Sequence, residues 1–176
     1  IVSRDWSSDV CSSDLLALRL GIPMYGADPR TFHLGTKSGC RMIFSQEGVS
    51  HPLGVEDLSS PDDLVAAIMD LRRRKPSITQ VVAKLNEGVS GLGNANISLA
   101  QVPPSGTPAE RAAVVAAVQA MAFESSQMTW ERYAAKLTET GGIVEELISG
   151  REFRSPSAQL RITPLGDVER SEEHTS

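Results

Sequence analysis

The fold of this chain is decided by residues 78–99, which read ITQVVAKLNEGVSGLGNANISL. Residues 78–85 are rich in β-branched side chains, and residues 95–99 alternate between apolar and polar types, so both segments are expected to form strands. Between them, residues 86–94 are polar and contain three glycines. We therefore predict a strand, a flexible glycine loop and a second strand that together form a hairpin.

The glycine loop fails to match three familiar loop motifs. A Walker A loop needs Lys followed by Ser or Thr, where this chain has Asn94 and Ala95. A dinucleotide-binding GxGxxG motif needs glycine at Asn96, and a serine-nucleophile elbow needs glycine at Leu92. What remains is a loop whose backbone N–H groups could cover phosphate oxygens, with Lys84 on the strand before it. The alternative is a surface hairpin with a solvated lysine.

Helices and further strands are expected on both sides of this hairpin. Ser60, Pro61 and early acidic residues mark the start of a helix that ends before Pro76. A capping box of Thr107 and Glu110 indicates the start of another helix. Spacing and flanking glycines predict the remaining elements: helices over 36–47, 107–123 and 129–140, and strands over 143–148 and 158–163, the last leading into a hairpin. The order indicates an α+β fold with antiparallel strands and flanking helices.

The two ends of the chain are unlike the sequence between them. Residues 170–176 can be encoded by AGATCGGAAGAGCACACGTCT, and the reverse complement of that string encodes residues 9–15, one base out of frame. We therefore interpret residues 1–15 and 170–176 as translated sequencing adapter and exclude them from the fold. On this interpretation, residues 16–35 are the end of a preceding domain. Residues 36–169 are then a nucleotide-binding region that is truncated at both ends.

Composition limits the classes of function that this chain can have. The whole chain carries a net charge of −5, and residues 16–169 alone carry −2. Without a surplus of Lys and Arg, we expect no nucleic acid and no membrane as a partner. No run of apolar residues is long enough to span a bilayer. Cys40 is the single cysteine of residues 16–169, so no disulfide framework is expected and a cytoplasmic location is the default.

Three segments together resemble the ATP-grasp superfamily. They are Gly35 to Cys40, Lys84 to Asn94 and Glu145 to Ser155. The likeness is closest to the pheganomycin-type peptide ligases, which are often described as carboxylate-amine ligases. The resemblance covers nearly all of residues 16–169, and it implies that ATP lies between two α+β subdomains.

The resemblance assigns one group of residues to the phosphates of ATP. Lys37 and Lys84 would contact the phosphates as cations against a polyanion, and Lys84 would also approach the N7 side of adenine. The loop residues expected at the nucleotide are Glu87, Gly88, Ser90, Gly91, Gly93 and Asn94. The alternative for Lys37 is a surface lysine in the first turn of its helix.

The resemblance assigns a second group of residues to the nucleoside. Glu145 would accept a hydrogen bond from the adenine amino group, and the backbone of Glu146 and Ile148 would pair with the purine edge. Leu147 would alternate to the other face of the strand. Glu152 would hold the ribose hydroxyl groups. The alternatives are a solvated strand edge for the two adjacent glutamates and an ion pair with a neighbouring arginine for Glu152.

The resemblance also implies a reaction. The parent enzyme would transfer the γ-phosphoryl group of ATP to a carboxylate, and an amine would then displace phosphate to form an amide or peptide bond. Such chemistry needs Mg²⁺, and in the family its carboxylate and Asn ligands lie downstream of the hinge strand, so no catalytic or metal-binding residue is assigned here. We expect this chain to hold ATP but to be inactive by itself. The carboxylate and amine substrates are not identified.

Two alternatives remain open at the level of function. The first is a non-catalytic nucleotide-binding or interaction module with the same α+β pattern. The second is a kinase-like or phosphate-dikinase use of the same ATP cleft.

Overall fold

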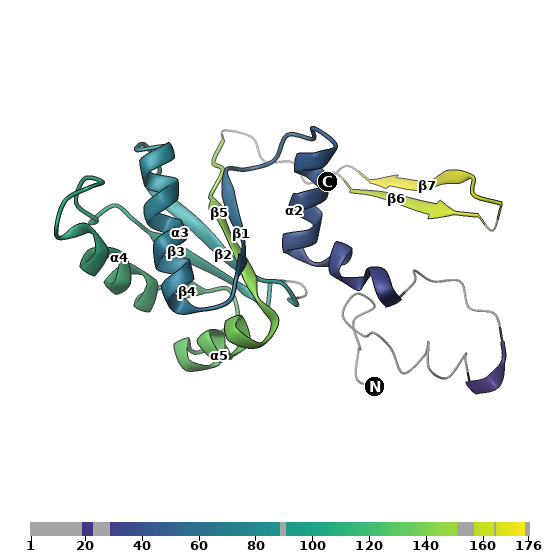
Figure 1. Ribbon diagram of the computed structural model, residues 1–176, viewed down its shortest axis with the longest axis horizontal. Helices are drawn as coiled ribbons and strands as arrows, with labels where there is room; N and C mark the ends of the chain where they lie inside the picture. Colours follow the sequence, from purple (N-terminus) through teal and green to yellow (C-terminus); the bar gives the residue numbers. More distant parts are fainter. Residues whose placement is uncertain (1–18, 23–28, 89–90, 151–156, 164, 175–176) are drawn as a thin grey trace.

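A computed structural model of the protein describes residues 19–22, 29–88, 91–150, 157–163 and 165–174. A five-stranded antiparallel sheet in the order β1-β5-β2-β3-β4 has helices on both faces (Figure 1). Its strands are β1 (Gly54–Leu58), β2 (Gln80–Leu85), β3 (Asn94–Ser98), β4 (Ala122–Phe123) and β5 (Gly142–Glu146). The helical elements are η1 (Pro29–Gly35), α2 (Lys37–Gln46), α3 (Pro61–Arg74), α4 (Glu110–Gln119) and α5 (Trp130–Thr140). The mixed α+β class with antiparallel strands is therefore confirmed.

Three of the helices begin at side-chain caps that the sequence contains. The Ser60 hydroxyl accepts a hydrogen bond of 3.1 Å from the Asp63 amide, and Pro61 stands at the first position of α3. Thr36 caps α2 and Thr129 caps α5 in the same way. Each such cap stabilises its helix by about 1 kcal/mol. These local signals explain why α2, α3 and α5 lie where they were predicted.

One face of the sheet is apolar and packs against α3, α4 and α5. Because side chains alternate along a strand, Val81, Ala83 and Leu85 of β2 share this face with Val144 of β5. The helix residues that meet them are Leu64, Ile68, Leu71, Val114, Val118, Tyr133 and Leu137. All of these side chains are fully or almost fully buried, so the hydrophobic core lies between this face and the three helices.

The opposite face of the sheet is more polar and carries α2. The register pairs Lys84 with Ile143 and Asn94, and it pairs Glu145 with Val82 and Gly54. Figure 1 shows α2 on the other side of the sheet from α3 and α4. The charged side chains of this face therefore lie outside the hydrophobic core, beside a helix that was predicted to carry Lys37.

The start of α4 differs from the predicted capping box. Thr107 Oγ1 donates a hydrogen bond to a carbonyl three residues earlier, and the N-cap residue is Ala109. The Glu110 carboxylate accepts from the Gly106 amide at 2.7 Å and from the Arg72 guanidinium at 2.7 Å. The prediction was wrong because a buried cation on α3 draws this carboxylate away from the cap position.

Two strands, β1 and β4, and the end of β5 also differ from the prediction. β1 was not predicted, because its residues do not alternate clearly and its pairing with β5 is irregular between Val55 and Leu58. Asp57, inside this irregularity, has a φ of 57°. β4 occupies the end of the segment that was predicted as one helix up to Phe123, and β5 ends at Glu146 rather than at 148.

The predicted C-terminal hairpin is present as a separate two-stranded sheet of β6 (Ser157–Ile162) and β7 (Val168–His174). The described side chains of residues 158–162 and 165–170 are exposed, so these positions bury no apolar face. Most of β7 is made of residues that we interpret as adapter. In the part of the chain that the structure describes, no helix has the length and apolar character needed to cross a bilayer.

Candidate functional site

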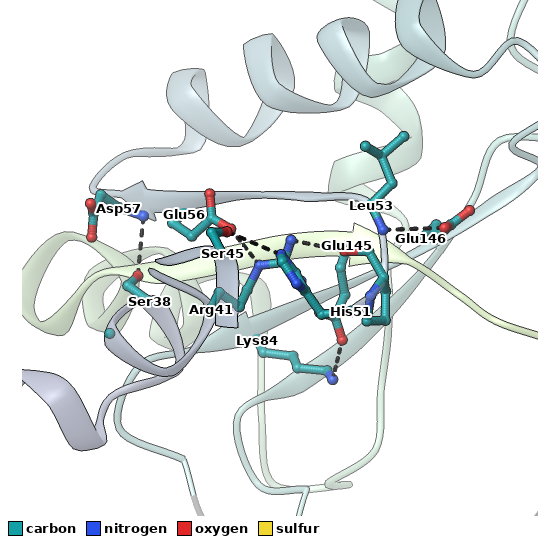
Figure 2. A network of polar contacts seen from close by, with 12 residues as sticks. Ser38, Arg41, Ser45, His51, Leu53, Glu56, Asp57, Lys84, Glu145 and Glu146 are labelled. Atoms are coloured by element: carbon teal, nitrogen blue, oxygen red, sulfur yellow. Dashed lines mark hydrogen bonds and ion pairs between the residues drawn. The ribbon is translucent and has the colours of Figure 1, made fainter. Parts of the chain in front are cut away.

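A buried ion-pair network connects α2 to the polar face of the sheet (Figure 2). Glu145 on β5 binds Lys84 Nζ through Oε1 at 2.5 Å and Arg41 Nη1 through Oε2 at 2.7 Å. Arg41 comes from α2, and its Nε also contacts Glu56 Oε1 at 2.6 Å. Arg41 and Glu145 are 5% and 8% exposed, so water screens their interaction only weakly. The network therefore holds Glu145 between two cations.

Gly54 leaves the space that the Arg41 guanidinium occupies. A Cβ atom at Gly54 would lie 2.5 Å from Arg41 Nη2 and 2.7 Å from the Val144 carbonyl oxygen. The third nitrogen of the guanidinium, Nη2, donates to the Pro52 carbonyl oxygen at 2.9 Å. Any larger residue in this position of β1 would displace the arginine. The missing side chain at Gly54 therefore allows Arg41 to cross edge strand β1 and reach Glu145.

Lys37 lies at the first position of α2 and contacts the glycine loop. Its Nζ donates a hydrogen bond of 3.0 Å to the Gly88 carbonyl oxygen. Burial lowers the pKa of Lys37 below its usual value, and the positive charge of Lys84 lowers this pKa further. Lys37 and Lys84 come from segments far apart in the chain and lie close enough to repel each other. They are the two lysines for which the family resemblance implies a contact with the phosphates.

Asn86 fixes the beginning of the glycine loop. Its Oδ1 accepts a hydrogen bond of 3.0 Å from the Ser38 amide in the first turn of α2. The backbone amide of Asn86 donates to the Gly141 carbonyl oxygen at 2.9 Å, next to the end of α5. The loop is thereby attached to both the helix that carries Lys37 and the strand that carries Glu145.

The predicted loop residues lie together between β2 and β3, where the structure describes them. The Leu85 amide donates to the Gly93 carbonyl oxygen at 2.9 Å, and the Asn94 amide donates to the Gly91 carbonyl oxygen at 3.0 Å. The Asn94 side chain turns to Glu124, with a distance of 3.2 Å. Glu87 is exposed, and Ser90 lies outside the described residues.

A cavity of about 280 Å³ lies beside this network. Its charged lining groups are Lys37, Arg41, Lys84 and Glu145, and its other lining residues are Gly35, Cys40, Phe44, His51, Pro52 and Ile143. The rings of Phe44 and His51 lie 6.0 Å apart. The volume is slightly below the usual range for small-molecule sites, and apolar walls with a few convergent polar groups are typical of such sites.

Glu146 points away from this cavity. Its carboxylate binds Lys75 Nζ at 2.5 Å and the Leu53 amide at 3.2 Å, and the hydrogen bond from Lys75 keeps the pKa of Glu146 below its usual value. The backbone amide of Glu146 donates to the Leu53 carbonyl oxygen at 2.8 Å. This amide is therefore used by the chain itself and does not point at the cavity of Lys84 and Glu145.

The remaining predicted nucleoside contacts lie beyond the end of β5. The Leu147 amide donates to the Gln80 carbonyl oxygen at 3.1 Å, and the side chains of Leu147 and Ile148 are 40% and 54% exposed. Both residues line a second cavity with Glu146, which has a volume of about 340 Å³. Glu152 lies outside the described residues.

Sequence reasoning missed Arg41, Glu56 and Asn86. Arg41 is four positions after Lys37, so the helical period already places the two cations on one side of α2. The apolar positions of α2 give the clearer sequence pattern, although Phe44 is 40% exposed and the buried α2 residues are Ser38, Gly39 and Arg41. In the ranges that the structure covers, no three His, Cys, Asp or Glu side chains are grouped as metal ligands.

Comparisons with known proteins give one distant similarity. No protein-family model matches the chain, and no solved structure matches it. The chain is 24% identical over 190 residues to a zebrafish (Danio rerio) protein described as IQ motif-containing protein H. The alignment covers 92% of this chain and 18% of that protein, so the chain spans less than a fifth of the length of its relative.

Proposed function

We propose that this chain is the ATP-binding portion of an ATP-grasp carboxylate-amine ligase. The observation that carries the proposal is the convergence of Lys37 and Lys84 beside the glycine loop. The two lysines line one cavity, and Lys37 is hydrogen-bonded to Gly88 of the loop. A nucleoside triphosphate would place its phosphates between the two ammonium groups and the backbone of the loop.

The charges around the cavity support a polyanionic ligand. The cluster contains three cations, Lys37, Lys84 and Arg41, and two carboxylates, Glu56 and Glu145. It therefore has an excess of positive charge. One of its three cations, Lys37, is partly buried, and its pKa is lowered. A bound anion would relieve the repulsion between the two lysines, because it would add negative charge beside both ammonium groups, whereas Glu145 contacts Lys84 alone of the two.

The same cavity has a wall suited to a purine ring. Phe44, Pro52 and Ile143 provide apolar surface, and Glu145 provides a carboxylate acceptor at the edge. In this arrangement the base lies on the Lys84 and Glu145 side of β5. The sugar and the phosphates extend toward the glycine loop, and the ribose contact of Glu152 remains part of the proposal.

ATP affinity measured by titration calorimetry tests the site. Lys84→Ala should lower the affinity by about tenfold or more, because it removes a charge-assisted contact and leaves Glu145 with less counter-charge. Glu152→Ala should lower the affinity by less. The matched control is Arg111→Ala, which removes an exposed ion pair between α4 and Asp62 and should leave the affinity unchanged. Unchanged affinity in both site variants would overturn the assignment.

The reaction is tested separately on the product of the whole natural gene. A ligase forms ADP and phosphate in the presence of Mg²⁺ only when a carboxylate and an amine are both supplied. ATP binding without such turnover would favour a non-catalytic nucleotide-binding module. The carboxylate activated as an acyl phosphate can be trapped with hydroxylamine, which makes the first step visible without the natural amine.

A further inference from the structure

We infer that Arg41 is a positioning residue that makes the site prefer adenine over guanine nucleotides, by holding the Glu145 carboxylate at the edge of the cavity. This inference rests on the proposed function, because it concerns the nucleotide expected between Lys37 and Lys84. Arg41 need not touch the nucleotide to act in this way. Its effect would pass through Glu145.

The guanidinium of Arg41 is held at all three nitrogens. Nε binds Glu56 at 2.6 Å, Nη1 binds Glu145 at 2.7 Å and Nη2 binds the Pro52 carbonyl oxygen at 2.9 Å. These partners come from β1, β5 and the segment before β1. A planar guanidinium can satisfy several directions at once, whereas an ammonium group is a single point of charge. The geometry of the site therefore calls for arginine in particular.

Glu145 needs a second cation if Lys84 is to serve a phosphate. Without a ligand, Lys84 Nζ lies 2.5 Å from Glu145 Oε1. A polyphosphate would compete for that ammonium group. Arg41 keeps Glu145 Oε2 bound at 2.7 Å, so the buried carboxylate would retain a counter-charge and its place while Lys84 turns to the ligand. Lys84 can thus change partners without leaving a buried, unpaired charge.

A fixed carboxylate distinguishes the two purines by their hydrogen-bonding groups. Adenine carries an amino group, which donates, where guanine carries a carbonyl oxygen, which accepts. An ionised carboxylate accepts only, and it has about four lone-pair positions for its partners. With Oε2 held by Arg41 and Oε1 released as Lys84 turns to the phosphates, Glu145 keeps capacity for the adenine amino group and repels the guanine oxygen.

The test is the ratio of ATP affinity to GTP affinity, measured by calorimetry on the full chain. Arg41→Lys keeps the positive charge but cannot hold three partners, so we expect the ATP-to-GTP ratio to fall by about tenfold. Glu145→Gln should lower the ratio by a similar factor, because the amide both donates and accepts. In the double variant, Arg41→Lys should add no further loss, because its effect passes through the Glu145 carboxylate.

Arg73→Lys is the matched control for the exchange of arginine for lysine. Arg73 forms an exposed ion pair with Asp70 on α3 and does not line the cavity, so the ratio should stay at the wild-type value. Circular dichroism and thermal unfolding show which variants are folded. An unchanged ratio in a folded Arg41→Lys variant, or a further loss in the double variant, overturns the inference while ATP binding itself stands. A wild-type chain that binds neither nucleotide overturns the proposed function and the inference with it.

Discussion

The Lys37 ammonium group on α2 donates a hydrogen bond of 3.0 Å to the carbonyl oxygen of Gly88, which lies 51 positions further along the chain. This contact joins the first turn of a helix to the loop between β2 and β3. It places one cation of the candidate site directly against the loop that was predicted to cover phosphate. Because the contact is partly buried, it also contributes to holding the loop in place.

Replacing Lys37 by Met should loosen the glycine loop. The side chain keeps its apolar stem and loses the donor to Gly88, so the loop should open more often. We expect the amides of Leu85 and Asn94, which donate to loop carbonyls, to exchange with deuterium about fivefold to tenfold faster. Amide exchange followed by NMR measures this change. Lys136→Met, at an exposed lysine of α5, is the control and should leave these two rates as they are.

The pH dependence of anion binding should follow the ammonium group of Lys37. Its pKa lies below the usual 10.5 because of burial and of the charge on Lys84. Affinity for inorganic triphosphate should therefore fall as the pH rises through this lowered pKa, because the neutral amine no longer attracts the anion. Lys37→Arg should keep its affinity to higher pH. Calorimetric titrations between about pH 7 and pH 10 measure both curves, and identical curves would contradict the assignment.

The same pKa shift gives a sign for stability without ligand. Between the lowered pKa and 10.5, the unfolded chain binds more protons at Lys37 than the folded chain does. This residue should therefore make the folded state more stable as the pH rises through that window. This rise in the free energy of unfolding with pH should disappear in Lys37→Met. Urea unfolding at several pH values measures it in both proteins.

The buried ion pair of Arg72 and Glu110 should be essential for stability. The two side chains are 8% and 2% exposed and meet at 2.7 Å. Arg72→Ala leaves the Glu110 carboxylate buried without its cation, so we expect the free energy of unfolding to fall by about 3–5 kcal/mol. Arg73→Ala removes an exposed ion pair on the same helix and should change the free energy of unfolding by at most about 0.5 kcal/mol. Urea denaturation compares the two variants.

Tyr133→Phe should leave the protein as stable or make it more stable. Among the described residues, the Tyr133 hydroxyl is buried and has no hydrogen-bond partner, and a buried unsatisfied polar group costs about 1–3 kcal/mol. Phenylalanine keeps the ring beside Phe123, whose centroid lies 5.5 Å away. Burial also raises the pKa of Tyr133, so wild-type stability should fall as the pH rises through about 10, where the unfolded tyrosine ionises. A clear loss of stability in the variant at pH 7 would contradict this account.

The parts of the fold that local chemistry determines were predictable. Ser60 and Pro61 define the start of α3, and Thr129 defines the start of α5, because each cap needs only residues within one helical turn. β1 was not predictable in this way. It becomes a strand by pairing with β5, some ninety positions later in the chain, and its own residues give a weak pattern.

Three residues that line the candidate cavity could be selected from the sequence, but the contacts among them could not. Lys37, Lys84 and Glu145 could be chosen by their resemblance to a family, and the structure brings these three side chains to one cavity. The part played by Arg41 follows from Gly54, which leaves room for it, and from the position of Glu145. Such a relationship depends on tertiary packing, which no pattern within a single helix expresses.

The alternation along β5 gives two neighbouring carboxylates opposite surroundings, since Glu145 meets Arg41 and Glu146 meets Lys75. A strand has a side-chain period of two, so a shift of β5 by one residue in its pairing would turn each carboxylate to the opposite face of the sheet. The chemistry of the cavity would then change without any change in composition. The place of Glu145 thus depends on the register of β5 and not on loop length: insertions between β2 and β3 leave its carboxylate on the same side of the sheet.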